Sequence, residues 1–100
     1  MTDSEINLAI AKIEYPAQAQ IERPVGELTP SIYVSGIGLV DYVNDSDIGQ
    51  IIEREKITVG YNNAGSLYFA HDRYGNAIAY SDTPNKAAAL TFLKMKGVEL

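Results

Sequence analysis

The segment "SLYFAHDRYGNAIAYS" (Ser66–Ser81) decides the fold, because it holds two strand-like runs on either side of a turn sequence. Gly and Asn in "RYGN" favour a tight turn between the runs. If Tyr74-Gly75 forms a two-residue loop, Phe69 pairs with Tyr80 and His71 pairs with Ile78. The segment is therefore predicted to be a β-hairpin.

A third strand-like run, Ile57–Tyr61, precedes the hairpin and is joined to it through "NNAG". A three-residue loop ending in a left-handed Gly65 would pair Val59 with Phe69. Both registers then place the larger apolar side chains on one face, which predicts a three-stranded antiparallel meander with a buried side. The predicted buried face contains Ile57, Val59, Tyr61, Leu67, Phe69, Ile78 and Tyr80. The other face carries small residues and one large aromatic, Tyr68.

Three helices are expected around this meander. Thr2 and Glu5 have the spacing of a capping box, and isoleucines recur at helical spacing as far as Ile13, which predicts a helix over Asp3–Glu14. A short central helix over Asp47–Glu55 would bury the stripe Ile48, Ile51 and Ile52. A third helix opens at Thr83-Pro84 and stops before Gly97.

The region between the first two helices carries weaker signals. The alternation in Ala17–Glu22 is that of an edge strand, and prolines and glycines punctuate the loop that follows. The run "SIYVSGIGLVDYV" (31–43) reads as one long strand with a bulge or tight turn at Gly36 and Gly38. The whole chain, residues 1–100, is predicted to be a single α+β domain.

Composition limits the kinds of partner. The chain has no cysteine, a net charge of −5 and a sequence pI of about 4.6. Because its basic residues are scattered singly, direct binding to nucleic acid is not expected. No signal peptide or membrane span is evident, so a cytoplasmic location is expected. The acidity suits either solubility or a partner protein with a basic surface.

The only histidine, His71, stands next to Asp72, with Ser66 and Ser81 nearby in the sequence. A hydrolase triad needs a nucleophile and an acid gathered around the histidine, but adjacent residues of a strand point to opposite faces. We therefore favour a hairpin histidine, and we predict no catalytic residue, metal site or cofactor. A small hydrolase or metal-dependent enzyme that uses His71 with nearby Asp and Ser residues is the alternative.

The segment "DYVNDSD" places Asp41, Asp45 and Asp47 within seven residues. Capping and dipole compensation at the start of the central helix would explain such a cluster. An acidic surface that contacts a partner would also explain it, and Tyr68 could anchor the same contact because aromatic residues dominate interface hot spots. We predict that Asp41, Asp45, Asp47 and Tyr68 bind a partner.

Two motifs carry a family resemblance: "GQIIEREKITV" (Gly49–Val59) and "TPNKAAALTFLKMKG" (Thr83–Gly97). Together they resemble the NinX-like family of small accessory proteins of lambdoid phages and prophages. That family shows Gly-Pro-Ile-Ile-Glu before a strand and a terminal helix that opens with Thr-Pro or Asn-Pro. Here Gln50 replaces the proline, and the tryptophan that often precedes the motif is absent.

The resemblance implies a phage or prophage protein that works in the host bacterial cytoplasm. With the small size and acidity, it favours a non-enzymatic accessory protein that binds and modulates a host protein. A host defence complex is one such target, which would make the protein an inhibitor of the anti-CRISPR kind. A structural subunit that acts by self-association, such as a homodimer, is a further alternative.

Overall fold

Three helices form the middle of the molecule, and their capping residues explain where they begin. The computed structural model describes residues 1–18, 21–22 and 29–98. Helix α1 (Asp3–Glu14) begins with the predicted capping box, in which the Glu5 N–H donates to Thr2 Oγ1 at 3.2 Å and the Thr2 N–H donates to Glu5 Oε1 at 2.9 Å. Helix α2 spans Ile48–Glu55 and helix α3 spans Pro84–Met95. All three predicted helices are confirmed.

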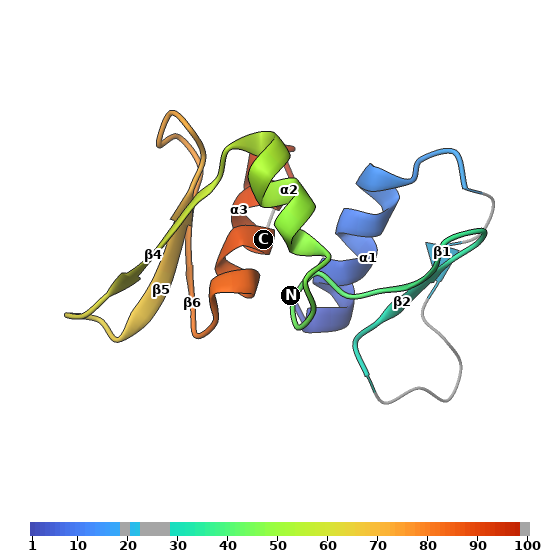
Figure 1. Ribbon diagram of the computed structural model, residues 1–100, viewed down its shortest axis with the longest axis horizontal. Coiled ribbons are helices and arrows are strands. Elements are labelled where there is room, and N and C mark those ends of the chain that lie inside the picture. The colour runs from blue at the N-terminus through green and yellow to red at the C-terminus, as the bar shows by residue number, and fades with distance from the viewer. Residues whose placement is uncertain (19–20, 23–28, 99–100) are drawn as a thin grey trace.

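The strands of the described residues form two separate antiparallel sheets of three strands each. One sheet contains β1 (Ile21–Glu22), β2 (Ile32–Val34) and β3 (Gly38–Val40). The other contains β4 (Thr58–Asn62), β5 (Leu67–His71) and β6 (Ile78–Ser81). The α+β class and the C-terminal meander are therefore confirmed. The sheets lie at opposite ends of the molecule with the helices between them (Figure 1).

The segment 31–43 is not one long strand, as the sequence predicted, but a hairpin. Gly36 and Gly38 adopt positive φ angles of 80° and 108°, and the Ile37 N–H donates to the Val34 carbonyl at 3.0 Å. These conformations are open to glycine and strained for other residues, so the chain reverses here. Of the predicted edge strand Ala17–Glu22, only Ile21–Glu22 is a strand, and residues 19–20 lie outside the described part of the chain.

The meander also differs from its predicted register. Phe69 pairs with Tyr80 as expected, but Val59 pairs with Ala70 instead of Phe69, because the β4–β5 loop has four residues rather than three. Its last residue, Ser66, has a positive φ of 54°. A shift of one residue turns β4 over relative to β5.

The predicted buried face of the meander was therefore wrong for most of its residues. The side that α3 covers is lined by small side chains, chiefly Ala70, Ala77 and Ala79, all buried. These allow α3 to approach so closely that the Thr91 hydroxyl lies 3.1 Å from the Ala70 carbonyl oxygen. Leu67, Phe69, Ile78 and Tyr80 face outward instead, and Leu67, Ile78 and Tyr80 are exposed. Tyr68 is the one large side chain of β5 and β6 on the helix-covered side, where it is partly buried.

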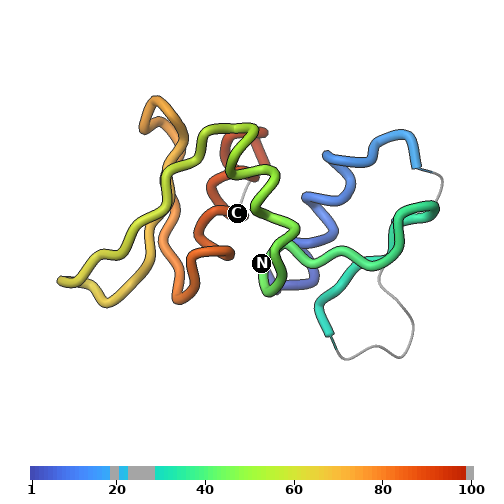
Figure 2. Tube along the Cα trace, in the orientation of Figure 1, coloured from blue at the N-terminus to red at the C-terminus, as the bar shows by residue number. Residues whose placement is uncertain are grey.

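Helix α3 occupies the centre of the molecule and contacts α1, α2 and all three strands of the β4–β6 sheet. Phe92 and Leu93 are fully buried in a continuous apolar core with residues of α1, α2 and both sheets. Ile51 is buried as predicted, whereas Ile52 is only partly buried. The molecule measures 41 × 26 × 23 Å, and its long axis runs from sheet to sheet (Figure 2).

Among the helices of the described residues, none combines the length and the apolar character that crossing a membrane requires.

Candidate functional site

A buried asparagine fixes the loop between β3 and α2. Asn7 lies on α1 and is fully buried. Its Nδ2 donates to the Pro30 carbonyl and to Asp41 Oδ1, both at 3.0 Å, and its Oδ1 accepts the Tyr42 N–H at 2.8 Å. One side chain therefore ties α1 to two separate loops. Sequence reasoning missed Asn7, although a polar residue between Ile6 and Ile10 on the buried stripe of α1 is a visible signal.

Asp41 serves the interior of this loop. Its side chain is only 5% exposed and accepts hydrogen bonds from the N–H groups of Val43 and Asn44, both at 3.0 Å. Burial pushes the pKa of Asp41 upward, but hydrogen bonds from Asn44, Asn7 and Val43 outweigh burial and hold it below its ordinary value. Because the Asp41 carboxylate is buried and accepts hydrogen bonds from Asn7, Val43 and Asn44, we do not include Asp41 in the proposed partner contact.

Asp47 stands at the start of α2, but its side chain does not cap that helix. Its Oδ2 instead accepts the Asp41 N–H at 3.0 Å, which holds the carboxylate beside the loop. There it lines a small surface pocket that is open to solvent. The other lining residues come from the end of α1, the β3–α2 loop and α2: Glu14, Tyr15, Tyr42, Gln50 and Ile51.

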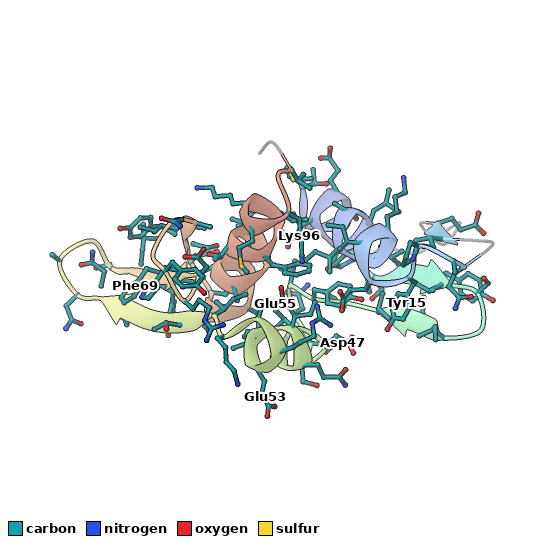
Figure 3. The ribbon with its side chains drawn as sticks, turned by 90° about the horizontal axis from the view of Figure 1, so that it is seen from above. Tyr15, Asp47, Glu53, Glu55, Phe69 and Lys96 are labelled. Atoms are coloured by element: carbon teal, nitrogen blue, oxygen red, sulfur yellow. The ribbon has the colours of Figure 1, made fainter. Side chains whose placement is uncertain are left out.

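Two tyrosines are among the residues that line this pocket. Tyr15 follows the last residue of α1, and Figure 3 shows it near Asp47. Tyr42 is only 3% exposed. Burial raises the pKa of Tyr42 well above its ordinary value, and Tyr15, Glu14 and Asp47 raise it further. The Tyr42 hydroxyl therefore stays protonated and can donate or accept a hydrogen bond at any physiological pH.

The negative charge of Glu14 is balanced by an ion pair with Arg54. Arg54 donates two hydrogen bonds to it, Nη1 to Oε1 at 2.8 Å and Nη2 to Oε2 at 2.9 Å. Hydrogen bonds to Glu14 and Glu55 raise the pKa of Arg54, so the guanidinium stays charged. The net negative charge of the pocket therefore comes mainly from Asp47.

The chemistry of the pocket suits a cationic side chain. The exposed surface of the pocket is almost entirely polar, and Asp47, Tyr15, Tyr42 and Gln50 line it with groups that can form hydrogen bonds to an ammonium or guanidinium group. Carboxylates form charge-assisted hydrogen bonds with such groups, and tyrosine hydroxyls can accept further hydrogen bonds from them.

The other predicted contact residues do not join this pocket. Asp45 is exposed on the loop, and its backbone carbonyl accepts a hydrogen bond from Asn85 Nδ2 at 3.2 Å. Tyr68 lies on the other sheet, where it is half-buried on the helix-covered side and packs edge-on against Tyr61 with ring centroids 5.0 Å apart. The structure thus brings Asp41 and Asp47 together and leaves Asp45 and Tyr68 apart from them.

His71 lies at the end of β5, next to the hairpin turn. Its Nδ1 is 2.7 Å from the backbone oxygen of Asp72, and its ring is parallel to that of Phe69. The Asp72 side chain accepts the Asn76 N–H at 2.7 Å, and the Ser81 hydroxyl donates to Asp82 at 3.0 Å. Asp72 and Ser81 therefore bond to residues other than His71. Within the described ranges, no three His, Asp or Glu side chains are grouped so that they could hold a metal ion.

Comparison of the chain with protein-family models, curated proteins and solved structures finds no match.

Proposed function

We propose that this protein is a small, non-enzymatic accessory protein of a phage or prophage that binds and modulates a host protein with a basic surface. The observation that carries the proposal is the pocket of Tyr15, Tyr42 and Asp47, whose negative charge and polar lining suit a lysine or arginine side chain. In this proposal, a basic residue of the partner enters the pocket in the bacterial cytoplasm. The resemblance to the NinX-like family supports the phage setting, and a host defence complex is one host target that such a protein would bind.

The charge around the pocket supports a basic partner. Residues 1–55 contain ten acidic and three basic side chains, a net charge of −7, and they include every residue that lines the pocket. Such a field steers a basic protein toward the site and raises the association rate at low salt. The exposed carboxylate of Asp45 adds to this field without touching the pocket.

The first test uses a defined probe in place of the unidentified partner. A capped tri-arginine peptide is titrated into isotopically labelled protein and followed by NMR, with a tri-citrulline peptide as the neutral, nearly isosteric control. We expect saturable shifts at the backbone amides of Tyr15, Asp47 and Gln50 with the arginine peptide alone. Shifts spread evenly over the acidic surface, or equal shifts with citrulline, would contradict a specific pocket.

Two matched variants distinguish binding in the pocket from general electrostatic attraction to the acidic surface. Asp47→Asn and Asp45→Asn each remove one negative charge from the same loop, but only Asp47 lines the pocket. Asn at position 47 retains a carbonyl oxygen that can accept the Asp41 N–H. We expect Asp47→Asn to weaken binding of the arginine peptide by about 3- to 10-fold, which corresponds to a half-exposed ion pair. Asp45→Asn should change it less than about 2-fold.

A further inference from the structure

The residues that line the pocket differ in how far they are buried. Tyr42 is 3% exposed, Glu14, Tyr15 and Asp47 are partly buried, and Gln50 is exposed. A charged group that enters the pocket therefore loses part of its hydration, and hydrogen bonds from the lining must replace the lost water contacts. The acceptors that remain unoccupied in the pocket thus decide which kind of cation fits best.

The Glu14 carboxylate already binds a guanidinium of its own chain. Arg54 Nη1 donates to Glu14 Oε1 at 2.8 Å, and Arg54 Nη2 donates to Glu14 Oε2 at 2.9 Å. In this paired arrangement a guanidinium uses both oxygens of one carboxylate at once. The guanidinium of a partner's arginine therefore cannot occupy the same position on Glu14.

The Asp47 carboxylate is half occupied. Its Oδ2 accepts the Asp41 N–H at 3.0 Å, and its side chain makes no capping bond to α2. Among the described residues, Oδ1 is thus the Asp47 oxygen that receives no hydrogen bond. A guanidinium that paired with both oxygens of Asp47 would have to share Oδ2 with a backbone N–H that the fold holds in place.

The remaining acceptors of the pocket are single oxygen atoms on separate residues. Tyr15 and Tyr42 each contribute a hydroxyl oxygen, and Gln50 contributes an amide oxygen. A lysine ammonium carries three N–H donors that point in different directions, so it can bond to several separate acceptors. An arginine guanidinium is planar and matches paired oxygens that lie in its own plane.

We propose that the pocket binds the ammonium group of a lysine side chain in preference to the guanidinium group of an arginine. This inference rests on the proposed function, because it names the residue type with which a basic partner enters the pocket. It goes further than net charge, since it follows from which carboxylate oxygens are already bonded within the chain.

General attraction to the acidic surface would not give this preference. A guanidinium is more weakly hydrated than an ammonium and forms paired hydrogen bonds with exposed carboxylates. An exposed acid such as Asp45 would therefore bind arginine at least as well as lysine. A preference for lysine distinguishes the pocket from the surface around it.

Parallel NMR titrations with capped tri-lysine and tri-arginine peptides test the preference. We expect the dissociation constant measured at the amides of Tyr15, Asp47 and Gln50 to be about 3- to 10-fold lower for the lysine peptide. Equal or tighter binding of the arginine peptide at these amides would overturn the preference and leave the proposed function standing. Shifts spread evenly over the acidic surface with both peptides would contradict both proposals.

A tri-peptide of trimethyl-lysine shows whether hydrogen bonds or charge alone hold the ammonium. Trimethylation keeps the positive charge and removes all three N–H donors. We expect it to weaken binding at the pocket amides by about 3-fold or more relative to tri-lysine. Unchanged affinity would overturn the proposal, because the separate acceptors would then make no contribution.

Arg54 and Lys96 offer a matched pair of substitutions. Both cations lie over the Phe92 ring, at 5.9 Å and 5.4 Å from its centroid, and both form an ion pair with Glu55. Figure 3 shows Lys96 and Glu55 in the middle of the molecule. Of the two cations, Arg54 is the one that binds Glu14. Arg54→Met and Lys96→Met therefore remove the same charge from the same cluster, but only the first frees the Glu14 carboxylate.

Arg54→Met should change the selectivity of the pocket. With both Glu14 oxygens free, the guanidinium of the peptide can take the place of the Arg54 guanidinium. We expect the ratio of the two dissociation constants to shift toward arginine by about 3-fold or more, and to stay within about 2-fold of the native ratio in Lys96→Met. Equal shifts in the two variants would overturn the proposal. Circular dichroism confirms folding, and Arg54→Gln with Lys96→Gln replaces the pair if a methionine variant does not fold.

Discussion

The Nδ2 of Asn7 donates a hydrogen bond to Asp41 Oδ1 at 3.0 Å, and through it the first helix holds the loop that carries the pocket. Both side chains are buried, and the same asparagine accepts the Tyr42 N–H. The position of Tyr42 therefore depends on a contact 35 residues away in the sequence.

Replacing Asn7 with Ala should lower the free energy of unfolding by about 2–4 kcal/mol, because buried hydrogen-bonding groups on Asp41, Tyr42 and Pro30 lose their partner. Chemical denaturation measures this change. Asn63→Ala, at an exposed position in the β4–β5 loop, should stay within about 0.5 kcal/mol of the native chain. Equal effects of the two substitutions would mean that the loop is not held by Asn7.

Replacing Asp41 with Asn should cost about 1–3 kcal/mol at neutral pH, because the new NH2 group replaces one acceptor oxygen and opposes one of the two Asn44 donors. The pKa of Asp41 in the folded protein is lower than its ordinary value of 3.8. The unfolded chain therefore takes up the proton first as the pH falls, and the stabilisation is complete only above that ordinary value. The difference between native and variant chains should shrink as the pH falls through about 4 and below. Thermal melts at several pH values test this, with Asp45→Asn as the control; a constant difference would contradict it.

Replacing Thr91 with Val should destabilise the protein by about 1–2 kcal/mol. The buried Thr91 hydroxyl lies 3.1 Å from the Ala70 carbonyl on β5 and 2.9 Å from the Ala87 carbonyl one turn earlier in α3. Valine keeps the shape and removes the hydrogen bond between helix and sheet. Denaturation of Thr91→Val beside Thr58→Val, at an exposed strand position, measures the contribution. A loss no greater than that of Thr58→Val would show that the hydroxyl is not needed.

Replacing Gly60 with Ala should displace the Phe69 ring. A Cβ atom at position 60 would lie 2.5 Å from Phe69 Cζ, so the ring, which lies on the outer side of the sheet, must move. Such packing of an aromatic ring over a glycine of the neighbouring strand is a known way to stabilise glycine in a sheet. Because His71 is parallel to Phe69, its ring proton resonances should shift, while stability changes by less than about 1 kcal/mol. Unchanged His71 resonances would contradict this packing.

Local signals predicted the helices well, because capping residues act within one turn. Thr2 and Glu5 make the predicted contacts, and Thr83 caps α3 where the sequence predicted that helix to open. The meander shows where such signals fail. A single extra loop residue, Ser66, changed the register of β4, and the close fit of α3 on alanines buried the side of β5 and β6 that looked less apolar. Neither effect is encoded locally.

The sequence predicted no pocket, and of the residues that line it only Asp47 was a predicted contact residue. Asp47 stood out because it is charged and near other acids, whereas Tyr15 and Tyr42 carry no local signature and meet through the contacts of Asn7. The cluster of three acids in the sequence also divides by role. Asp41 is buried and Asp45 is exposed, a difference that the sequence pattern does not indicate.

The central position of α3 has a consequence for synthesis on the ribosome. The chain emerges from its N-terminus, so α3 is the last of the described helices and strands to leave the exit tunnel. Until then the apolar surfaces of α1, α2 and the β4–β6 sheet lack the helix that joins them. The nascent chain therefore remains open to proteases and chaperones until Phe92 and Leu93 are in place, and the native state forms only once translation has passed them.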